Sequence, residues 1–248
     1  MTGPAIEVAN VSKAFLVGGP MAGSLKSLLL FWKRRTKTRL PILDGVSFTV
    51  ARGETLAVVG RNGAGKSTLL SLLARIYRPD TGTVRVNGRL APLLELGAGF
   101  HPDLSGRENV VFNAVILGLT RKQVAARMDE IIAFSELGAQ IDAPVRTYSS
   151  GMTARLGFAV ATHVDADVLL VDEVLAVGDF DFERKCYARI DEFRRAGGTI
   201  LLVSHQAETV RRFADRAIFL QHGKIVAEGS PDHVLDRYAS ESESVRRG

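Results

Sequence analysis

Short runs of apolar, often β-branched residues alternate along this chain with longer segments whose apolar positions recur every three to four residues. The short runs have the length of buried strands, and the longer segments have the period of helices. This alternation is typical of an α/β fold. The runs that predict strands cover residues 6–11, 46–50, 55–59, 168–171, 199–203 and 217–220.

The stretch from residue 106 to residue 164 has helical periodicity, with Val124, Met128, Ile131 and Ile132 spaced to cover one helix face. The strand pattern returns after it, which predicts a helical insertion into the sheet. With 248 residues, 46% hydrophobic and 24% charged, the chain has the size and composition of a single globular domain. We therefore predict one domain over residues 1–248, with a helical subdomain at about 104–164.

Positive charge is concentrated near the N-terminus. Between Glu7 and Asp44 there is no acidic residue, and Trp32 and several leucines lie among the basic ones. Anionic lipids attract such cations, and tryptophan favours the headgroup region. Residues of about 21–40 are therefore predicted to form a basic amphipathic insertion that contacts lipid or a membrane partner; a solvated loop is the alternative. The basic residues are Lys13, Lys26, Lys33, Arg34, Arg35, Lys37 and Arg39.

Signals for membrane insertion or secretion are not expected. The apolar run at residues 28–32 is far shorter than the roughly 20 residues that cross a bilayer. The first residues lack a basic flank followed by an apolar stretch, so we predict no secretory signal and a location in the cytosol. The single cysteine, Cys186, cannot form a disulfide within the chain.

A phosphate-binding loop follows the predicted strand at 55–59. Glycine, four residues, glycine, lysine and serine form the P-loop pattern, and a predicted helix at 67–76 follows it. Glycines let consecutive N–H groups approach phosphate oxygens, and the helix N-terminus adds partial positive charge. Lys66 is expected to reach the β- and γ-phosphates of ATP, Ser67 to bind Mg²⁺ and Thr68 to support the loop. The residues expected to hold ATP are Gly60, Arg61, Asn62, Gly63, Ala64, Gly65, Lys66, Ser67 and Thr68.

Acidic residues end a second buried run. Asp172 follows residues 168–171 and is expected to hold the metal, and Glu173 to polarise the attacking water as general base. His205 follows the next strand and is expected at the same sheet edge, where it can donate to the γ-phosphate and hold the carboxylate. A structural or exposed histidine is the alternative. Together with the loop, this pattern predicts nucleotide hydrolysis.

The segment Tyr148-Ser149-Ser150-Gly151-Met152, with Arg155-Leu156-Gly157-Phe158-Ala159 after it, resembles the signature region of ABC transporter nucleotide-binding subunits. Three of the five signature positions differ from the common leucine, serine, glycine, glycine, glutamine form. The version here is similar to that of the polysaccharide-exporting branch, which handles O-antigen, capsule and teichoic acid. Residues 93–102, 104–109 and 172–179 resemble the same branch, and the likeness runs from about residue 6 to 238.

The resemblance implies a P-loop NTPase fold of ABC type, with a mixed sheet core, an antiparallel β subdomain and a helical subdomain. It also implies that Ser149, Ser150 and Gly151 of one copy close over the γ-phosphate of ATP held by a second copy. Asp179 would act across the same dimer, and Phe15 would stack on adenine, with a plain core phenylalanine as the alternative. Two chains would thus enclose two ATP molecules.

One family feature is missing from the sequence. The family usually carries a glutamine that touches Mg²⁺ and senses the membrane partner, but no glutamine lies between Asn87 and Gln123. Glu95 is the nearest polar substitute by position. It is therefore a candidate metal ligand.

The function implied is ATP hydrolysis coupled to export of a lipid-linked polysaccharide or polyol-phosphate polymer. The expected partners are a second copy, integral membrane permease subunits and the glycan, at the cytoplasmic face of the inner membrane, with no nucleic acid. We expect no appended carbohydrate-binding domain of the kind that some relatives carry. The alternative is a soluble ABC ATPase acting on nucleic acid or ribosomes, but such proteins generally have two fused domains or long coiled-coil insertions. An ordinary P-loop kinase would not need the Ser149 to Gly151 segment.

Overall fold

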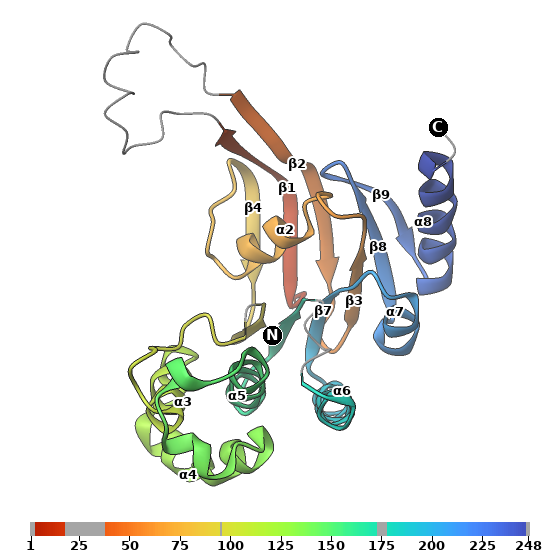
Figure 1. The fold of residues 1–248 in the computed structure, drawn as a ribbon. Helices are drawn as coiled ribbons and strands as arrows, with labels where there is room; N and C mark the ends of the chain where they lie inside the picture. The colour runs from red at the N-terminus through yellow and green to blue at the C-terminus, as the bar shows by residue number, and fades with distance from the viewer. Residues whose placement is uncertain (1–2, 18–37, 95, 173–177, 247–248) are drawn as a thin grey trace, which may run out of the picture.

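The computed structural model describes residues 3–17, 38–94, 96–172 and 178–246, which form two sheets and surrounding helices (Figure 1). The strands are β1 (Ile6–Val17), β2 (Thr38–Val50), β3 (Thr55–Val59), β4 (Thr81–Val86), β5 (Leu90–Leu93), β6 (Val168–Val171), β7 (Thr199–Val203), β8 (Arg216–Gln221) and β9 (Lys224–Gly229). The helices are α2 (Lys66–Leu73), α3 (Gly106–Ile116), α4 (Arg121–Ser135), α5 (Ser150–Thr162), α6 (Phe180–Arg195), α7 (Ala207–Phe213) and α8 (Pro231–Arg246). Short 3-10 turns cover Gly138–Asp142 and Val145–Thr147.

The larger sheet has the strand order β5-β6-β7-β3-β8-β9. Its first five strands are parallel, and β9 pairs antiparallel with β8. Every residue of β3, β6 and β7 is buried, as expected for parallel strands covered on both faces. Because these strands run in the same direction, the loops that follow them leave from one edge of the sheet.

The smaller sheet is antiparallel, in the order β2-β1-β4. Its first two strands are longer than predicted, since pairing continues from Phe15 with Leu40 to Val17 with Thr38. Residues 38–40, assigned from the sequence to the basic insertion, therefore belong to β2, because cross-strand pairs of apolar and β-branched side chains extend the hairpin. The rest of that predicted insertion, residues 21–37, lies outside the described residues.

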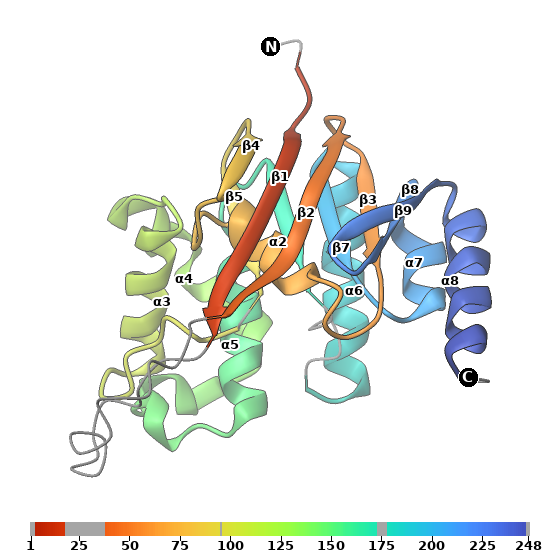
Figure 2. The same ribbon diagram turned by 90° about the horizontal axis from the view of Figure 1, so that it is seen from above.

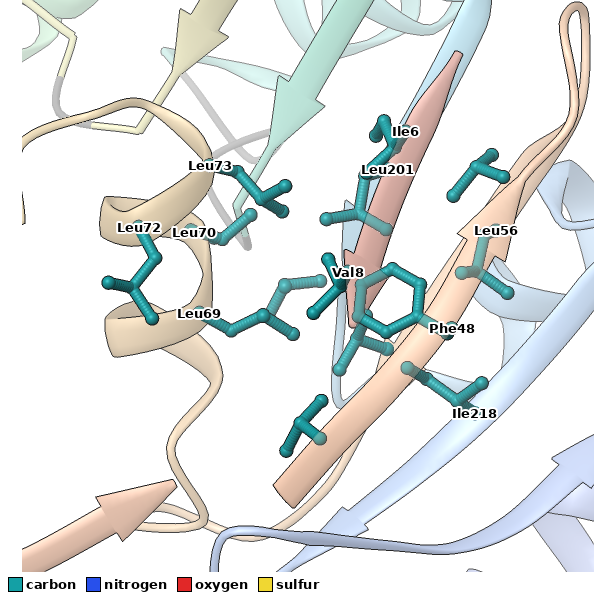
Figure 3. Packing of buried hydrophobic residues seen from close by; sticks show 14 of the residues in the cluster. Ile6, Val8, Phe48, Leu56, Leu69, Leu70, Leu72, Leu73, Leu201 and Ile218 are labelled. Carbon is teal, nitrogen blue, oxygen red and sulfur yellow. The ribbon is translucent and has the colours of Figure 1, made fainter. Parts of the chain in front are cut away.

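Helix α2 packs between the two sheets (Figures 1 and 3). Its leucines Leu69, Leu70 and Leu73 are buried in one cluster with residues of both sheets, among them Val8 and Leu56. Burying a leucine side chain contributes about 1.5–3 kcal/mol. The N-terminus of α2 is thereby held firmly at the sheet edge.

Helices α3, α4 and α5 form a group on one side of the molecule, and α7 and α8 lie on the other (Figures 1 and 2). The predicted apolar face of α4 is confirmed, because Val124 and Ile131 are buried and Met128 and Ile132 pack against the same cluster. Capping boxes begin both α3, at Ser105 and Glu108, and α4, at Thr120 and Gln123. Among the residues described, no helix has both the length and the hydropathy to cross a bilayer.

Candidate functional site

The loop between β3 and α2 surrounds a pocket of about 340 Å³. Gly65 caps α2 in the left-handed region, with φ at 109°, and a Cβ there would lie 2.7 Å from the Leu43 side chain. Only glycine fits this position without a shift of its neighbours. The pocket is lined by Ile42, Asn62, Gly63, Gly65, Lys66, Ser67 and Thr68.

Lys66 is the first residue of α2 and is only 7% exposed. Its ammonium donates to the carbonyl oxygens of Gly60 at 2.6 Å and Arg61 at 3.2 Å. Ser67 is exposed at the start of the same helix. The pocket thus combines a cation, a hydroxyl and a helix N-terminus, which is the chemistry that binds a phosphate chain.

Ile42 lines this pocket, although sequence reasoning did not select it. It comes from β2, at the point where the pairing register between β1 and β2 shifts. Nothing in the local sequence marks the residue, because its role depends on a tertiary contact with Gly65.

The strands β6 and β7 deliver Asp172 and His205 to the edge of the sheet from which the phosphate loop leaves. Val171, the last residue of β6, pairs with Leu202, and Val203 at the end of β7 pairs with Val58 of β3. Asp172 is half-buried, and His205 is exposed two residues beyond β7. The predicted general base Glu173 and the candidate metal ligand Glu95 lie outside the described residues.

The oxygen-rich donor set fits Mg²⁺, which prefers one or two protein oxygens together with substrate phosphates and waters. The candidates are the Ser67 hydroxyl, after β3, and the Asp172 carboxylate, after β6, at the same edge of the sheet. Among the described residues no cluster of three or more histidine, cysteine, aspartate or glutamate side chains is arranged to hold a metal by itself.

Ser149 and the two residues after it lie on α5, in the helical group. Ser149 is the N-cap of α5, and its hydroxyl oxygen accepts from the Met152 N–H at 3.2 Å. A serine hydroxyl can also donate one hydrogen bond. Ser149 and Ser150 are exposed and Gly151 is half-buried. Within the described chain, none of these three residues lines the pocket around Lys66.

Asp179 is the N-cap of α6 and is exposed. Its carboxylate accepts from the Phe182 N–H at 3.0 Å and from the Arg155 guanidinium at 2.8 Å. The Phe182 N–H and the nearby Arg155 charge hold the pKa of Asp179 below its ordinary value. Asp179 is therefore a fixed carboxylate, and sequence reasoning missed its partner Arg155.

Phe15 lies half-buried on β1, where its ring meets Tyr77 edge to face with centroids 5.2 Å apart. The Lys13 ammonium lies 5.5 Å from the centre of the same ring. The neighbouring residue Ala14 pairs with Pro41, which directly precedes Ile42 at the phosphate pocket. The aromatic ring is thus carried by the strand beside the pocket wall.

The ABC transporter family profile matches residues 43–176, which include the phosphate loop and the segment from Ser149 to Asp172. The chain belongs to the ABC transporter family. Among its relatives in this family, the O-antigen export system ATP-binding protein RfbB of Klebsiella pneumoniae is 46% identical over 95% of this chain and 97% of its own length.

Two further relatives of this ABC transporter chain are longer than it is. The O-antigen export system ATP-binding protein RfbB of Myxococcus xanthus is 53% identical over 87% of this chain and 50% of its own. The teichoic acids export ATP-binding protein TagH of Lactococcus lactis is 45% identical over 79% of this chain and 42% of its own. The chain therefore spans about half or less of these two relatives, and the predicted branch of the family is confirmed.

The ABC transporter fold is also that of solved structures. An ATP-binding subunit of an ABC transporter superposes with a TM-score of 0.76 over 96% of this chain and 98% of its own, at 23% identity. An ATP-binding cassette solved as a dimer with ADP and Pi gives a TM-score of 0.73 over 91% and 98%, at 19% identity. The predicted α/β fold, with its mixed sheet and antiparallel β subdomain, is confirmed.

Proposed function

We propose that this protein is the ATP-hydrolysing subunit of an exporter that moves a lipid-linked polysaccharide or polyol-phosphate polymer across the cytoplasmic membrane. The observation that supports ATPase activity is that Lys66, Asp172 and His205 lie at one edge of the parallel sheet. The nature of the cargo is supported by the relatives named for O-antigen and teichoic acid export.

ATP binding would place the triphosphate in the pocket at the N-terminus of α2. The Lys66 ammonium would exchange its carbonyl partners for β- and γ-phosphate oxygens, which are stronger acceptors. The exposed backbone of Gly63 and its neighbours would supply N–H groups to the phosphates. The Phe15 ring, on the adjoining strand, would stack on adenine.

Hydrolysis would occur at the γ-phosphate. Glu173 accepts a proton from a water whose oxygen attacks the γ-phosphorus, and the bond between this phosphorus and the β-phosphate oxygen breaks. ADP and inorganic phosphate then leave. His205 would donate to the γ-phosphate and hold the Glu173 side chain. Mg²⁺, held by Ser67 and Asp172 when bound, would neutralise phosphate charge. Glu95 stays a further candidate ligand.

A second copy would complete the site. Ser149, Ser150 and Gly151 lie on a different part of the molecule from the pocket around Lys66, so they are available to another protomer's nucleotide. The capped N-terminus of α5 would present N–H groups and partial positive charge to the γ-phosphate. Asp179 would reach across the same interface. ATP would thus hold two chains together, and its cleavage would release them.

The pair would bind integral membrane permease subunits at the cytoplasmic face of the membrane, and the permease would provide the path for the polymer. A strain that lacks the gene tests this assignment. We expect the polymer to disappear from the cell surface and its lipid-linked form to accumulate inside. Wild-type protein should restore export, and the Glu173→Gln variant should not, because it loses turnover.

Affinity purification separates this assignment from the alternative. We expect the tagged protein to bring down an integral membrane protein. Unchanged surface polymer in the deletion strain, together with recovery of ribosomes or nucleic acid, would contradict the proposal. Phosphate release by the purified chain, compared with Lys66→Ala, checks the ATPase activity separately.

A further inference from the structure

The Arg155 side chain joins three helices. It lies near Asp179, which is proposed above to contact the second protomer, and on the helix that begins after Ser149. Its Nη1 lies 3.0 Å from Oε2 of Glu136, and its Nη2 lies 2.8 Å from Oδ2 of Asp179. The guanidinium carbon is 4.7 Å from the centre of the Phe182 ring, and the side chain is only 18% exposed. A single planar group therefore connects α5, the end of α4 and the start of α6.

The contact of Arg155 with the start of α6 involves the backbone of Gly178 as well as the side chain of Asp179. Gly178 has φ at +78°, and a Cβ at this residue would lie 2.9 Å from Nε of Arg155. Gly178 thus approaches the guanidinium so closely that only glycine fits there without displacing it. With the Phe182 N–H holding the other carboxylate oxygen of Asp179, the start of α6 is fixed against Arg155.

The contact of Arg155 with Glu136 is also held in place by neighbouring residues. Glu136 ends α4 in the left-handed region, and its Oε1 accepts from the Lys185 ammonium at 3.0 Å. Lys185, on α6, donates in addition to the Phe134 carbonyl at 2.9 Å. Glu136 is therefore held by α6 while it holds Arg155, so the guanidinium is fixed from both sides.

Arg155 lies six residues after Ser149 on the same helix, which corresponds to about 9 Å along the axis. The side chain that fixes Asp179 is thus mounted on the helix whose N-terminus carries Ser149 and Gly151. A rigid helix keeps the distance between these two positions constant. Arginine suits this position because its fork reaches two separate acceptors at once, whereas lysine has one compact ammonium.

We propose that Arg155 is a positioning residue for the ATP-bound dimer, which sets Asp179 relative to the N-terminus of α5 so that both meet the second copy together. The inference rests on the proposed function, in which these two elements act on a partner's nucleotide. The role assigned to Arg155 requires no contact of its own with nucleotide or partner, since its side chain is only 18% exposed. Arg155 fixes the geometry of the groups that are proposed to make such contacts.

The test measures dimer affinity separately from nucleotide affinity, in a Glu173→Gln parent that retains ATP. Sedimentation over a range of protein concentrations with ATP and Mg²⁺ gives the dimer dissociation constant. Titration of dilute protein with a fluorescent ATP analogue gives the affinity of one chain. The variants are Arg155→Ala, Arg155→Lys and Glu136→Gln, with Arg107→Ala as a control, because Arg107 forms an ion pair with Asp142 outside α5 and α6.

We expect Arg155→Ala and Arg155→Lys to weaken the dimer roughly tenfold, as loss of about one charged hydrogen bond predicts, and Glu136→Gln to weaken it less. Nucleotide affinity of the single chain should stay within about twofold, and Arg107→Ala should match the parent. Combining Arg155→Lys with Asp179→Asn should weaken the dimer by less than the product of the two single effects, because both changes remove the contact between these two residues.

The inference would be overturned if Arg155→Lys had the same dimer affinity as the parent. It would also be overturned if only Arg155→Ala weakened the dimer and that weakening matched a loss of thermal stability. Both results leave the proposed function intact. A parent that stays monomeric with ATP would instead contradict the proposed function, and the inference with it.

Discussion

The Lys66 ammonium donates a 2.6 Å hydrogen bond to the carbonyl oxygen of Gly60, which joins the two ends of the phosphate loop. The side chain is held across the pocket rather than extended into solvent, and its burial at the start of α2 fixes the position of the charge. A phosphate anion is a stronger partner for an ammonium than a carbonyl oxygen. The loop therefore presents a cation that is already placed for exchange.

Lys66→Ala removes this cation and is expected to weaken ATP binding about 10- to 100-fold, as the loss of 1.5–3 kcal/mol of charged hydrogen bonding predicts. Equilibrium titration with a fluorescent ATP analogue measures the change. Lys224→Ala is a suitable control, since Lys224 is exposed and paired with Asp44. Equal affinities for the Lys66 variant and wild type would exclude Lys66 from phosphate binding.

Phe15→Ala is expected to weaken ATP binding roughly tenfold, because stacking of a base on an aromatic ring contributes about 1–3 kcal/mol. Phe15→Tyr should retain affinity, since the ring remains. Competition with inorganic tripolyphosphate distinguishes a contact with the base from a contact with the phosphates. The affinity for tripolyphosphate should be the same in wild type and Phe15→Ala. If tripolyphosphate binding falls as much as ATP binding, Phe15 acts through the fold and does not stack on adenine.

Asp80 joins β1, β2 and the segment before β4. Its carboxylate accepts from Lys13 at 3.0 Å, from Arg39 at 2.8 Å and from the Ala14 N–H at 3.0 Å. These bonds, that of Lys13 first, lower the pKa of Asp80 from 3.8 to about 2. Since the folded pKa lies below the unfolded one, the stabilisation is complete above pH 3.8 and disappears as the pH falls through about 2.

Asp80→Asn should therefore lower the melting temperature at pH 7, and the gap to wild type should close as the pH approaches 2. Thermal unfolding followed by circular dichroism at a series of pH values checks this. A gap that stays constant down to pH 2 would show that the Asp80 charge does not contribute in this way.

Asn109 is fully buried at the start of α3. Its side chain accepts from the His101 N–H at 2.7 Å and donates to the carbonyls of His101, Leu104 and Ser105. Asn109→Ala leaves the His101 N–H without its acceptor and removes the side-chain bonds to three carbonyls that keep a backbone donor. We expect it to reduce the free energy of unfolding by roughly 2–4 kcal/mol. Denaturant titration measures the loss. Asn113→Ala, which removes bonds from a half-buried side chain, should cost about 1 kcal/mol, and equal losses would contradict the account.

The central strands could be predicted to the residue. Strands β3, β6 and β7 begin and end where the sequence places them, because strands buried on both faces form continuous apolar runs. Strands β4 and β9 were not predicted, since their residues are mostly exposed or alternate and carry no such run. Strand β5 was not predicted either, because it contains Pro92 and is defined by its pairing with β6. Helix α2 ends at Leu73, before the predicted residue 76, because Arg75 adopts a positive φ.

The candidate site likewise has a part that the local sequence predicts and a part that depends on tertiary contacts. The phosphate loop could be predicted because its chemistry is contained in eight consecutive residues. The wall made by Ile42 and the contacts of Arg155 with Glu136 and Asp179 could not, since they join residues 19 to 24 positions apart or on different strands. Contacts of that kind become visible only when the chain is folded.

Disulfide trapping tests the two-chain site most directly. Cysteines are introduced as Asn62→Cys in the phosphate loop and Ser150→Cys on α5, in a Glu173→Gln background. The native Cys186 does not interfere, because burial raises the pKa of its thiol to about 12. Under mild oxidation with ATP and Mg²⁺ we predict a covalent dimer that is absent with ADP and in either single-cysteine variant. Failure to trap a dimer with ATP, or trapping that does not depend on nucleotide, would contradict the account.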